Sequence, residues 1–138
     1  MKTFSRLMAL VLLLSILSCA SVPMKQEEID PWLAAISGDK PAALNVQGRW
    51  HDPESEGVFG WGEGDIYQDG NKLRGIIGSY NLKGIVSGEM VYVAFYTKGK
   101  VYYTAKLKMP ENNVLLGKYF EAKDKEQKNG FPTKFIID

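Results

Sequence analysis

Glu63 and Asp65 are the residues whose types and spacing come closest to those of a catalytic pair. They stand two positions apart in a segment with strand-like composition, so both carboxylates face the same side about 6.5 Å apart. Paired carboxyl groups near that separation act as acid and base in glycoside hydrolysis. If they face outward with Trp61 and Tyr67, they form a solvated acidic stripe. If they face inward, they are a polar anchor for a ligand more readily than a hydrolytic pair.

His51 is the single histidine, and it is followed by Asp52-Pro53. No Gly-X-Ser-X-Gly segment supplies a nucleophile elbow, so we predict a surface histidine at a strand end and no catalytic residue. Asp52, Glu54 and Glu56 offer three oxygen ligands to calcium from one loop, but their spacing is not that of an EF-hand. The sequence therefore predicts an acidic loop, with neither a metal nor another cofactor.

Cys19 is the only cysteine, and it follows a typical leader. Lys2 and Arg6 precede an apolar run from Leu7 to Leu17, which is too short to cross a bilayer and is typical of a secretory signal peptide. The alternative is an ordinary signal whose cysteine is incidental or pairs with a second chain.

The end of that run, Ile16-Leu17-Ser18-Cys19-Ala20, resembles the lipobox of bacterial lipoproteins, which are cut by signal peptidase II. The resemblance implies that residues 1–18 are removed and that Cys19 carries acyl chains such as palmitate. Because Ala20 replaces the aspartate of a retention signal, the resemblance also implies attachment to the outer membrane, facing the periplasm. Several acyl chains would make this attachment stable.

Composition limits the remaining chain to one small globular domain. The 138 residues include 17 Lys+Arg and 16 Asp+Glu, and 12% are aromatic. A single cysteine cannot build a disulfide scaffold, and a net charge of +1 argues against nucleic acid as a partner. The charge is uneven along the chain, since residues 19–70 hold three basic and ten acidic residues, and residues 71–138 hold twelve and six. The basic flank is a candidate contact for anionic lipid or an envelope polymer, and ordinary solvated strands are the alternative.

Turn residues divide the mature chain into a tether (19–29), a short helix with a linker (30–43) and a β-domain (44–138). Asp30-Pro31 and Gly38 predict a helix over 31–37, whose apolar residues pack on the end of the following domain. Beyond it we predict eight strands, at 44–51, 61–68, 72–80, 83–87, 90–96, 100–108, 114–121 and 133–137. Hairpin signals such as Asp69-Gly70 join most of them. The fold class predicted is all-β, an eight-stranded antiparallel up-and-down barrel, because closure removes both free edges.

Alternation assigns faces to the strands. Lys106 and Lys108 must reach water, so the opposite face of that strand is directed inward. The predicted interior consists of the core-facing residues Val101, Tyr103, Ala105 and Leu107 of that strand, with Trp50, Val93 and Phe95 from two others. Tyr92, Tyr96 and Tyr102 then face outward.

Gly48-Arg49-Trp50 on the first strand resembles the Gly-X-Trp signature of the lipocalins and the wider calycin barrels. The resemblance implies that Trp50 packs across a closed end and that the barrel binds an apolar ligand. The sequence has no second lipocalin motif, and its length is closer to that of an avidin-sized barrel. Short strands filled by aromatic residues leave little empty space in eight strands.

Residues 57–64 are rich in glycine but lack both the register and the following helix of a phosphate-binding loop. We interpret them as the entrance to one mouth of the barrel, with Phe59 and Trp61 as candidate aromatic contacts. For Trp61, core packing is the alternative.

Three functions follow as hypotheses. The first is a non-enzymatic, lipid-anchored envelope protein that binds an apolar or amphipathic small molecule through Trp50, Phe59, Trp61, Val93, Phe95, Tyr103 and Leu107. The second is a structural lipoprotein with a solid barrel, which contacts another envelope protein through its outer tyrosines. The third is a hydrolase that uses Glu63 and Asp65. An open or a packed interior distinguishes the first from the second.

Overall fold

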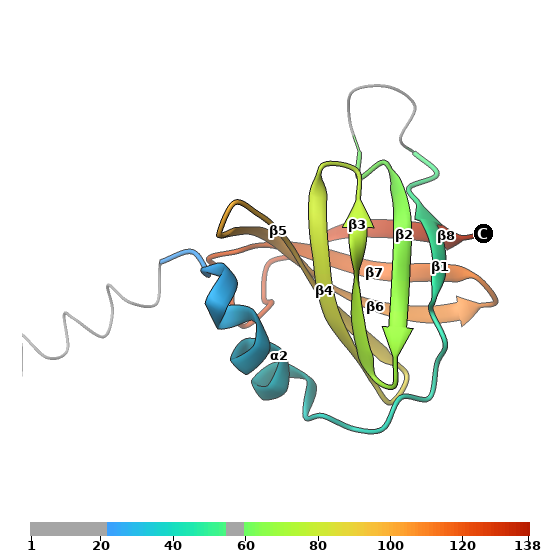
Figure 1. The fold of residues 1–138 in the computed structure, drawn as a ribbon, viewed down its shortest axis with the longest axis horizontal. Helices are drawn as coiled ribbons and strands as arrows, with labels where there is room; N and C mark the ends of the chain where they lie inside the picture. Colours follow the sequence, from blue (N-terminus) through green and yellow to red (C-terminus); the bar gives the residue numbers. More distant parts are fainter. Residues whose placement is uncertain (1–21, 55–59) are drawn as a thin grey trace, which may run out of the picture.

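A computed structural model describes residues 22–54 and 60–138 of the chain. Cys19, Phe59 and the leader lie outside the described residues. The chain forms a closed barrel of eight antiparallel strands in sequential order, with one short helix on its outer side (Figure 1). The predicted fold class is therefore confirmed.

The strands are β1 (Gly48–His51), β2 (Glu63–Asp69), β3 (Lys72–Ile77), β4 (Tyr80–Ser87), β5 (Met90–Thr97), β6 (Lys100–Glu111), β7 (Val114–Glu121) and β8 (Phe131–Ile137). Tight turns join each strand from β2 to β7 to the next one, and residues with positive φ such as Gly70 and Asn113 occupy them. The barrel closes where Trp50 pairs with Ile137 and His51 with Ile136. The Asp138 amide donates a further hydrogen bond to the Arg49 carbonyl at 2.8 Å.

Several strand boundaries differ from the prediction by one to four residues, and two of these differences have local causes. The β3–β4 turn lies at Gly78-Ser79 and not at residues 81–82, between the predicted strands 72–80 and 83–87, because Gly78 supplies the positive φ (56°) that the turn needs. Residues 44–47 belong to no strand. The Gln68 side chain accepts a hydrogen bond from the Val46 amide and donates one to the Leu44 carbonyl, so it replaces a strand ladder there.

The interior is filled by side chains. Trp50, Val93, Phe95 and Leu107 are fully buried, and they pack with apolar residues of the other strands. These side chains face inward as predicted, but they belong to a packed core and not to the lining of a cavity. Trp50 also donates a hydrogen bond from its indole Nε1 to the Val46 carbonyl at 2.7 Å.

A second apolar cluster lies outside the barrel, beneath the N-terminal residues. Helix α2 (Ile29–Ser37) follows the 3-10 turn η1 (Gln26–Glu28), ends at Gly38 with φ 70° as predicted, and contacts β4 and β5. It covers the wall of the barrel and not an end, which corrects the predicted packing (Figure 1). Leu33 of α2 is buried there against this wall.

Val101 belongs to this outer cluster, although alternation predicts it in the interior. The β5–β6 register shifts between Phe95 and Tyr96, so that Phe95 pairs with Tyr103 and Tyr96 with Val101. One extra residue in β6, as in a β-bulge, reverses the facing of Val101. Tyr103 lies on the other side of this shift, and its side chain faces the interior as predicted.

The described part of the expected tether is packed on the barrel from Met24 onward. Met24 is 2% exposed, and its carbonyl accepts a hydrogen bond from the Val101 amide at 3.2 Å. The Gln26 amide donates a hydrogen bond to the Gly99 carbonyl at 3.0 Å, and the backbones of Lys25 and Lys100 form an isolated antiparallel β-bridge. The segment thus pairs with the start of β6, and a free tether extends no further than Pro23.

Candidate functional site

The aromatic mouth is a cluster of four rings at one end of the barrel: Trp61, Tyr80, Tyr103 and Tyr119. They line an open hollow of about 470 Å³ together with the polar and loop residues Asp52, Glu54, Gly60, Pro132, Thr133 and Lys134. Tyr103 comes from β6 and Tyr119 from β7, and both are partly buried on the inner side of their strands.

Trp61 forms the floor of the aromatic mouth. Its ring stacks on Phe95 at 4.3 Å between centroids, while Tyr103 and Tyr119 meet it edge-on at 5.4 and 5.3 Å. Below it, the rings of Phe95, Phe135 and Trp50 continue the packing through the barrel. The hollow therefore ends at Trp61, and the core lies beneath it.

Glycines place Trp61 in this position. Gly62 has φ 80°, so the chain turns before β2 and Trp61 leaves the alternation of that strand. A Cβ on Gly78 would meet the Trp61 carbonyl oxygen at 2.2 Å, so only glycine allows the β3–β4 turn to approach so closely. The sequence identified Trp61 as a mouth residue, but strand alternation alone would direct it outward with Tyr67.

Hydrogen bonds fix the indole from two sides. Asp52 Oδ2 accepts from the Trp61 backbone amide at 3.0 Å, and Thr133 Oγ1 accepts from the indole Nε1 at 2.9 Å. Both partners, Asp52 and Thr133, belong to the rim of the hollow, so the rim holds the indole in its position as the floor. This function of Asp52 and Thr133 was not predicted from the sequence, because it depends on contacts between distant segments.

The tyrosine hydroxyls of the mouth are available for hydrogen bonding. Within residues 22–54 and 60–138, no hydrogen bond engages the hydroxyls of Tyr80, Tyr103 or Tyr119. Burial raises the pKa of Tyr80, and the neighbouring Tyr103 and Tyr102 raise it further, so this hydroxyl stays protonated near neutral pH. Neutral hydroxyls both donate and accept, and aromatic faces beside them suit an amphipathic ligand.

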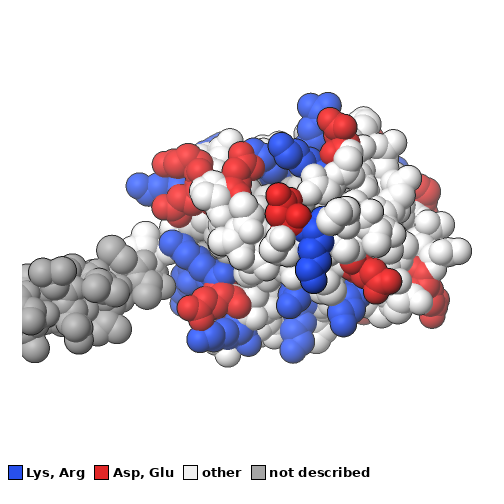
Figure 2. Space-filling model, turned by 90° about the horizontal axis from the view of Figure 1, so that it is seen from below, with Lys and Arg blue, Asp and Glu red and all other residues white. Residues whose placement is uncertain are grey.

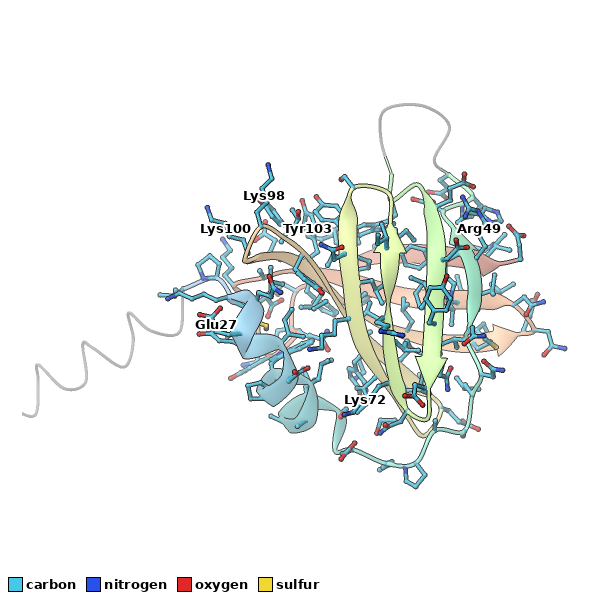
Figure 3. All side chains as sticks on the ribbon, viewed as in Figure 1. Glu27, Arg49, Lys72, Lys98, Lys100 and Tyr103 are labelled. Carbon is cyan, nitrogen blue, oxygen red and sulfur yellow. The ribbon has the colours of Figure 1, made fainter. Side chains whose placement is uncertain are left out.

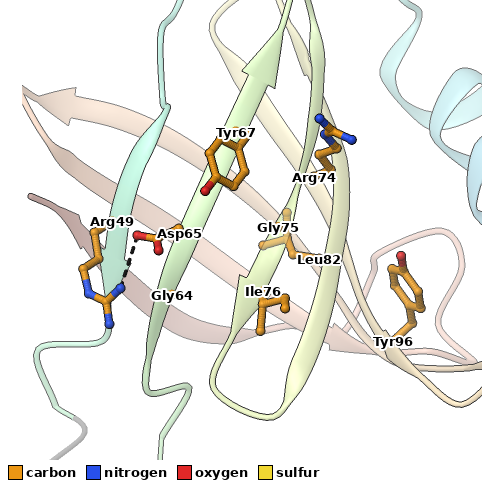
Figure 4. Close-up of a pocket in the computed structure, with 9 residues that line it drawn as sticks. All are labelled: Arg49, Gly64, Asp65, Tyr67, Arg74, Gly75, Ile76, Leu82 and Tyr96. Atoms are coloured by element: carbon orange, nitrogen blue, oxygen red, sulfur yellow. Dashed lines mark hydrogen bonds and ion pairs between the residues drawn. The ribbon is translucent and has the colours of Figure 1, made fainter.

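Glu63 and Asp65 lie on the outer wall, away from the aromatic mouth. Arg49 contacts both, through Nη2 to Glu63 Oε1 at 3.1 Å and through Nη1 to Asp65 Oδ1 at 3.2 Å. Figure 4 shows the second of these contacts, between Arg49 and Asp65. Hydrogen bonds to Glu63 and then Asp65 raise the pKa of Arg49. The two carboxylates face outward beside Tyr67, so they form an exposed ion-pair network. The open hollow next to them, of about 600 Å³, is lined by residues of β1 to β5.

Other candidate residues of the sequence are placed apart from the mouth. His51 Nδ1 lies 3.0 Å from Asp138 Oδ2 at the closing strands, where it is partly buried. In the described part of the chain no group of three acidic, histidine or cysteine side chains is arranged to hold a metal ion, and Glu56 lies outside that part. Of the three outer tyrosines, Tyr92 is buried beneath α2, and Tyr102 is 44% exposed.

No helix among the described residues has both the length and the apolar character to span a membrane. The fold places the chain among the eight-stranded up-and-down barrel proteins. Comparison of the chain with protein-family models, curated proteins and solved structures finds no match.

Proposed function

We propose that this protein is a lipid-anchored, non-enzymatic envelope protein that binds an amphipathic small molecule at the aromatic mouth. The observation that carries the proposal is a hollow with four aromatic rings and three hydroxyls lacking a described partner, set above a filled interior. The ligand's apolar part lies against the rings of Tyr103 and Tyr119, and its polar groups meet the hydroxyls and the rim.

The proposed ligand lies at the mouth and not in the interior of the barrel. Trp50, Val93, Phe95 and Leu107 have 0% exposure and offer no surface to a ligand, because neighbouring side chains fill the space that a lipocalin-type cavity would occupy. Anchoring by Cys19 is supported by the lipobox resemblance and by the leader before it. The calycin resemblance of Gly48 to Trp50 agrees with a barrel that binds small ligands.

Titration with an amphipathic fluorescent probe, anilinonaphthalene sulfonate, tests the mouth. We expect saturable binding of one probe per chain, because the hollow has a single aromatic floor. Tyr103→Ala combined with Tyr119→Ala should weaken binding by about fivefold to 150-fold, because two aromatic rings at about 0.5 to 1.5 kcal/mol each contribute about 1 to 3 kcal/mol together. NMR chemical-shift changes should centre on the Trp61 indole N–H and Thr133.

Tyr67→Ala is the matched control, because Tyr67 is a 55% exposed tyrosine on the outer wall of β2 and does not line the mouth. It should leave probe binding unchanged. Unfolding by urea establishes that each variant is folded. Binding that is lost equally in Tyr67→Ala, or shifts that centre on the outer wall, would contradict a site at the mouth.

A further inference from the structure

The lysine face is a set of outward side chains on three neighbouring strands, β6, β7 and β8. It consists of Lys106, Lys108, Leu116, Lys118, Lys134 and Ile136. The strand register arranges it in two rows. Lys108, Leu116 and Lys134 stand opposite one another in the first row, and Lys106 stands opposite Lys118 in the second.

The charges of this face have no acidic counterpart on it. Within the described residues, none of its four lysines forms an ion pair, and Lys106 only contacts the Tyr92 ring at 5.8 Å. The acidic residues of these strands, Glu111 and Glu121, stand at the ends of β6 and β7. Figure 2 shows basic and acidic side chains mixed over much of one side of the molecule, with basic ones prevailing along its lower border.

Two features of this face indicate an anionic partner. Like charges directly opposite each other destabilise a sheet. An anion bound between Lys106 and Lys118 would reduce the repulsion between their ammonium groups. Leu116 is 41% exposed at the centre of the first row, between two lysines. Lysines around an exposed aliphatic side chain match a lipid surface, where ammonium groups meet phosphates and the apolar group enters the interface.

The position of the N-terminal segment fits the same membrane. Met24 is held against Val101 at the start of β6, and the lysine face occupies the second half of that strand. Cys19 precedes Val22 by three residues, a span of at most about 11 Å. Figure 3 shows Lys98 and Lys100 at the β5–β6 turn beside this segment. An acylated Cys19 would therefore keep the barrel close to the headgroups.

We propose that the lysine face lies on anionic phospholipid headgroups of the membrane that anchors the chain. The inference rests on the proposed lipid anchor for the identity of the membrane. Contact through this face orients the barrel along the bilayer and brings Lys134, which also lines the hollow of the aromatic mouth, to the headgroups. The acyl chains supply attachment, whereas the lysines supply orientation.

Sedimentation with vesicles tests the lysine face without the anchor. The chain is made from Ala20 onward, which removes Cys19 and keeps every described residue. We expect it to bind vesicles of phosphatidylcholine mixed with phosphatidylglycerol, and not pure phosphatidylcholine. Binding should be lost near 1 M NaCl, where screening acts within about 3 Å. Lys108→Gln, Lys118→Gln and Lys134→Gln together should reduce partitioning on the order of 100-fold, at about fivefold per lysine.

The matched control replaces three exposed cations on other surfaces, Lys40→Gln, Lys72→Gln and Arg74→Gln, with the same change in net charge. It should reduce partitioning by less than about fivefold, since these residues do not belong to the face. Equal losses in the two triple variants, or equal binding to both kinds of vesicle, would overturn the proposal. So would binding to a soluble anionic polysaccharide in the absence of vesicle binding. Failure of acylation at Cys19 would not affect this assay, so the two proposals fail separately.

Discussion

Cys19→Ser is expected to transfer the protein from the membrane fraction to the soluble fraction while the barrel remains folded. Acyl chains bind membranes with about 0.8 kcal/mol per buried methylene, so several chains outweigh every other contact of this protein with lipid. Fractionation with a wash near 1 M NaCl is the measurement, because high salt screens the lysine face and leaves an acyl anchor in place. Circular dichroism verifies the barrel.

A second variant separates acylation from retention by an uncut leader. It carries an ordinary cleavable secretion signal directly before Ala20, so it has neither the leader nor Cys19. Ser18→Ala, which keeps the cysteine, serves as the control and should remain in washed membranes. If the second variant also remains there after the wash, the lipoprotein assignment is wrong.

Trp50→Ala is expected to lower the free energy of unfolding by about 3 to 5 kcal/mol, as for other large aromatic residues in a core. Trp50 is fully buried and its ring lies 5.6 Å from that of Phe135, so truncation leaves a cavity that the closed barrel cannot collapse. The Val46 carbonyl also loses its indole donor, and a buried unsatisfied acceptor is itself costly. Urea unfolding measures the loss.

Trp50→Phe and Tyr67→Ala are the controls for this measurement. The phenylalanine keeps much of the ring and removes the hydrogen bond, so its loss should be smaller than that of Trp50→Ala. Tyr67 is exposed on the outer wall, and its truncation should change stability by no more than about 0.5 kcal/mol. A loss below about 1 kcal/mol for Trp50→Ala would mean that Trp50 is not part of the packed core.

Local signals explain why the barrel is predictable from the sequence. Turn residues such as Asp69-Gly70 set the hairpins, and the exposed Lys106 and Lys108 fix the facing of β6. The packing of the N-terminal segment was harder to predict from the sequence. Met24 reads as part of a polar, non-periodic stretch, and only pairing with the distant β6 buries it. The β6 irregularity that turns Val101 outward likewise carries no local signal.

The candidate site was only partly predictable. Trp61 and Tyr103 emerged from the glycine-rich segment and from alternation, and the structure brings them together in the mouth. Tyr80 and Tyr119 were missed because each follows its own strand pattern and joins the others only when the barrel closes. Tyr119 shares a face with Leu115, which is a signal that inspection of β7 alone would provide. The sequence alone does not predict that the interior is filled, because this depends on how the side-chain volumes fit together in the closed barrel.

Closure of the barrel through β1 and β8 has a consequence for the order in which the chain can fold. A chain delivered from its N-terminus, during synthesis or translocation, can form the hairpins from β2 to β7 one after another. Trp50 obtains its partner Ile137 only when β8 has emerged. Such distant pairings are slow to form, and strand edges left open until then invite association between chains. Delivery of β8 is therefore the step that closes the barrel, because β8 pairs with both β1 and β7.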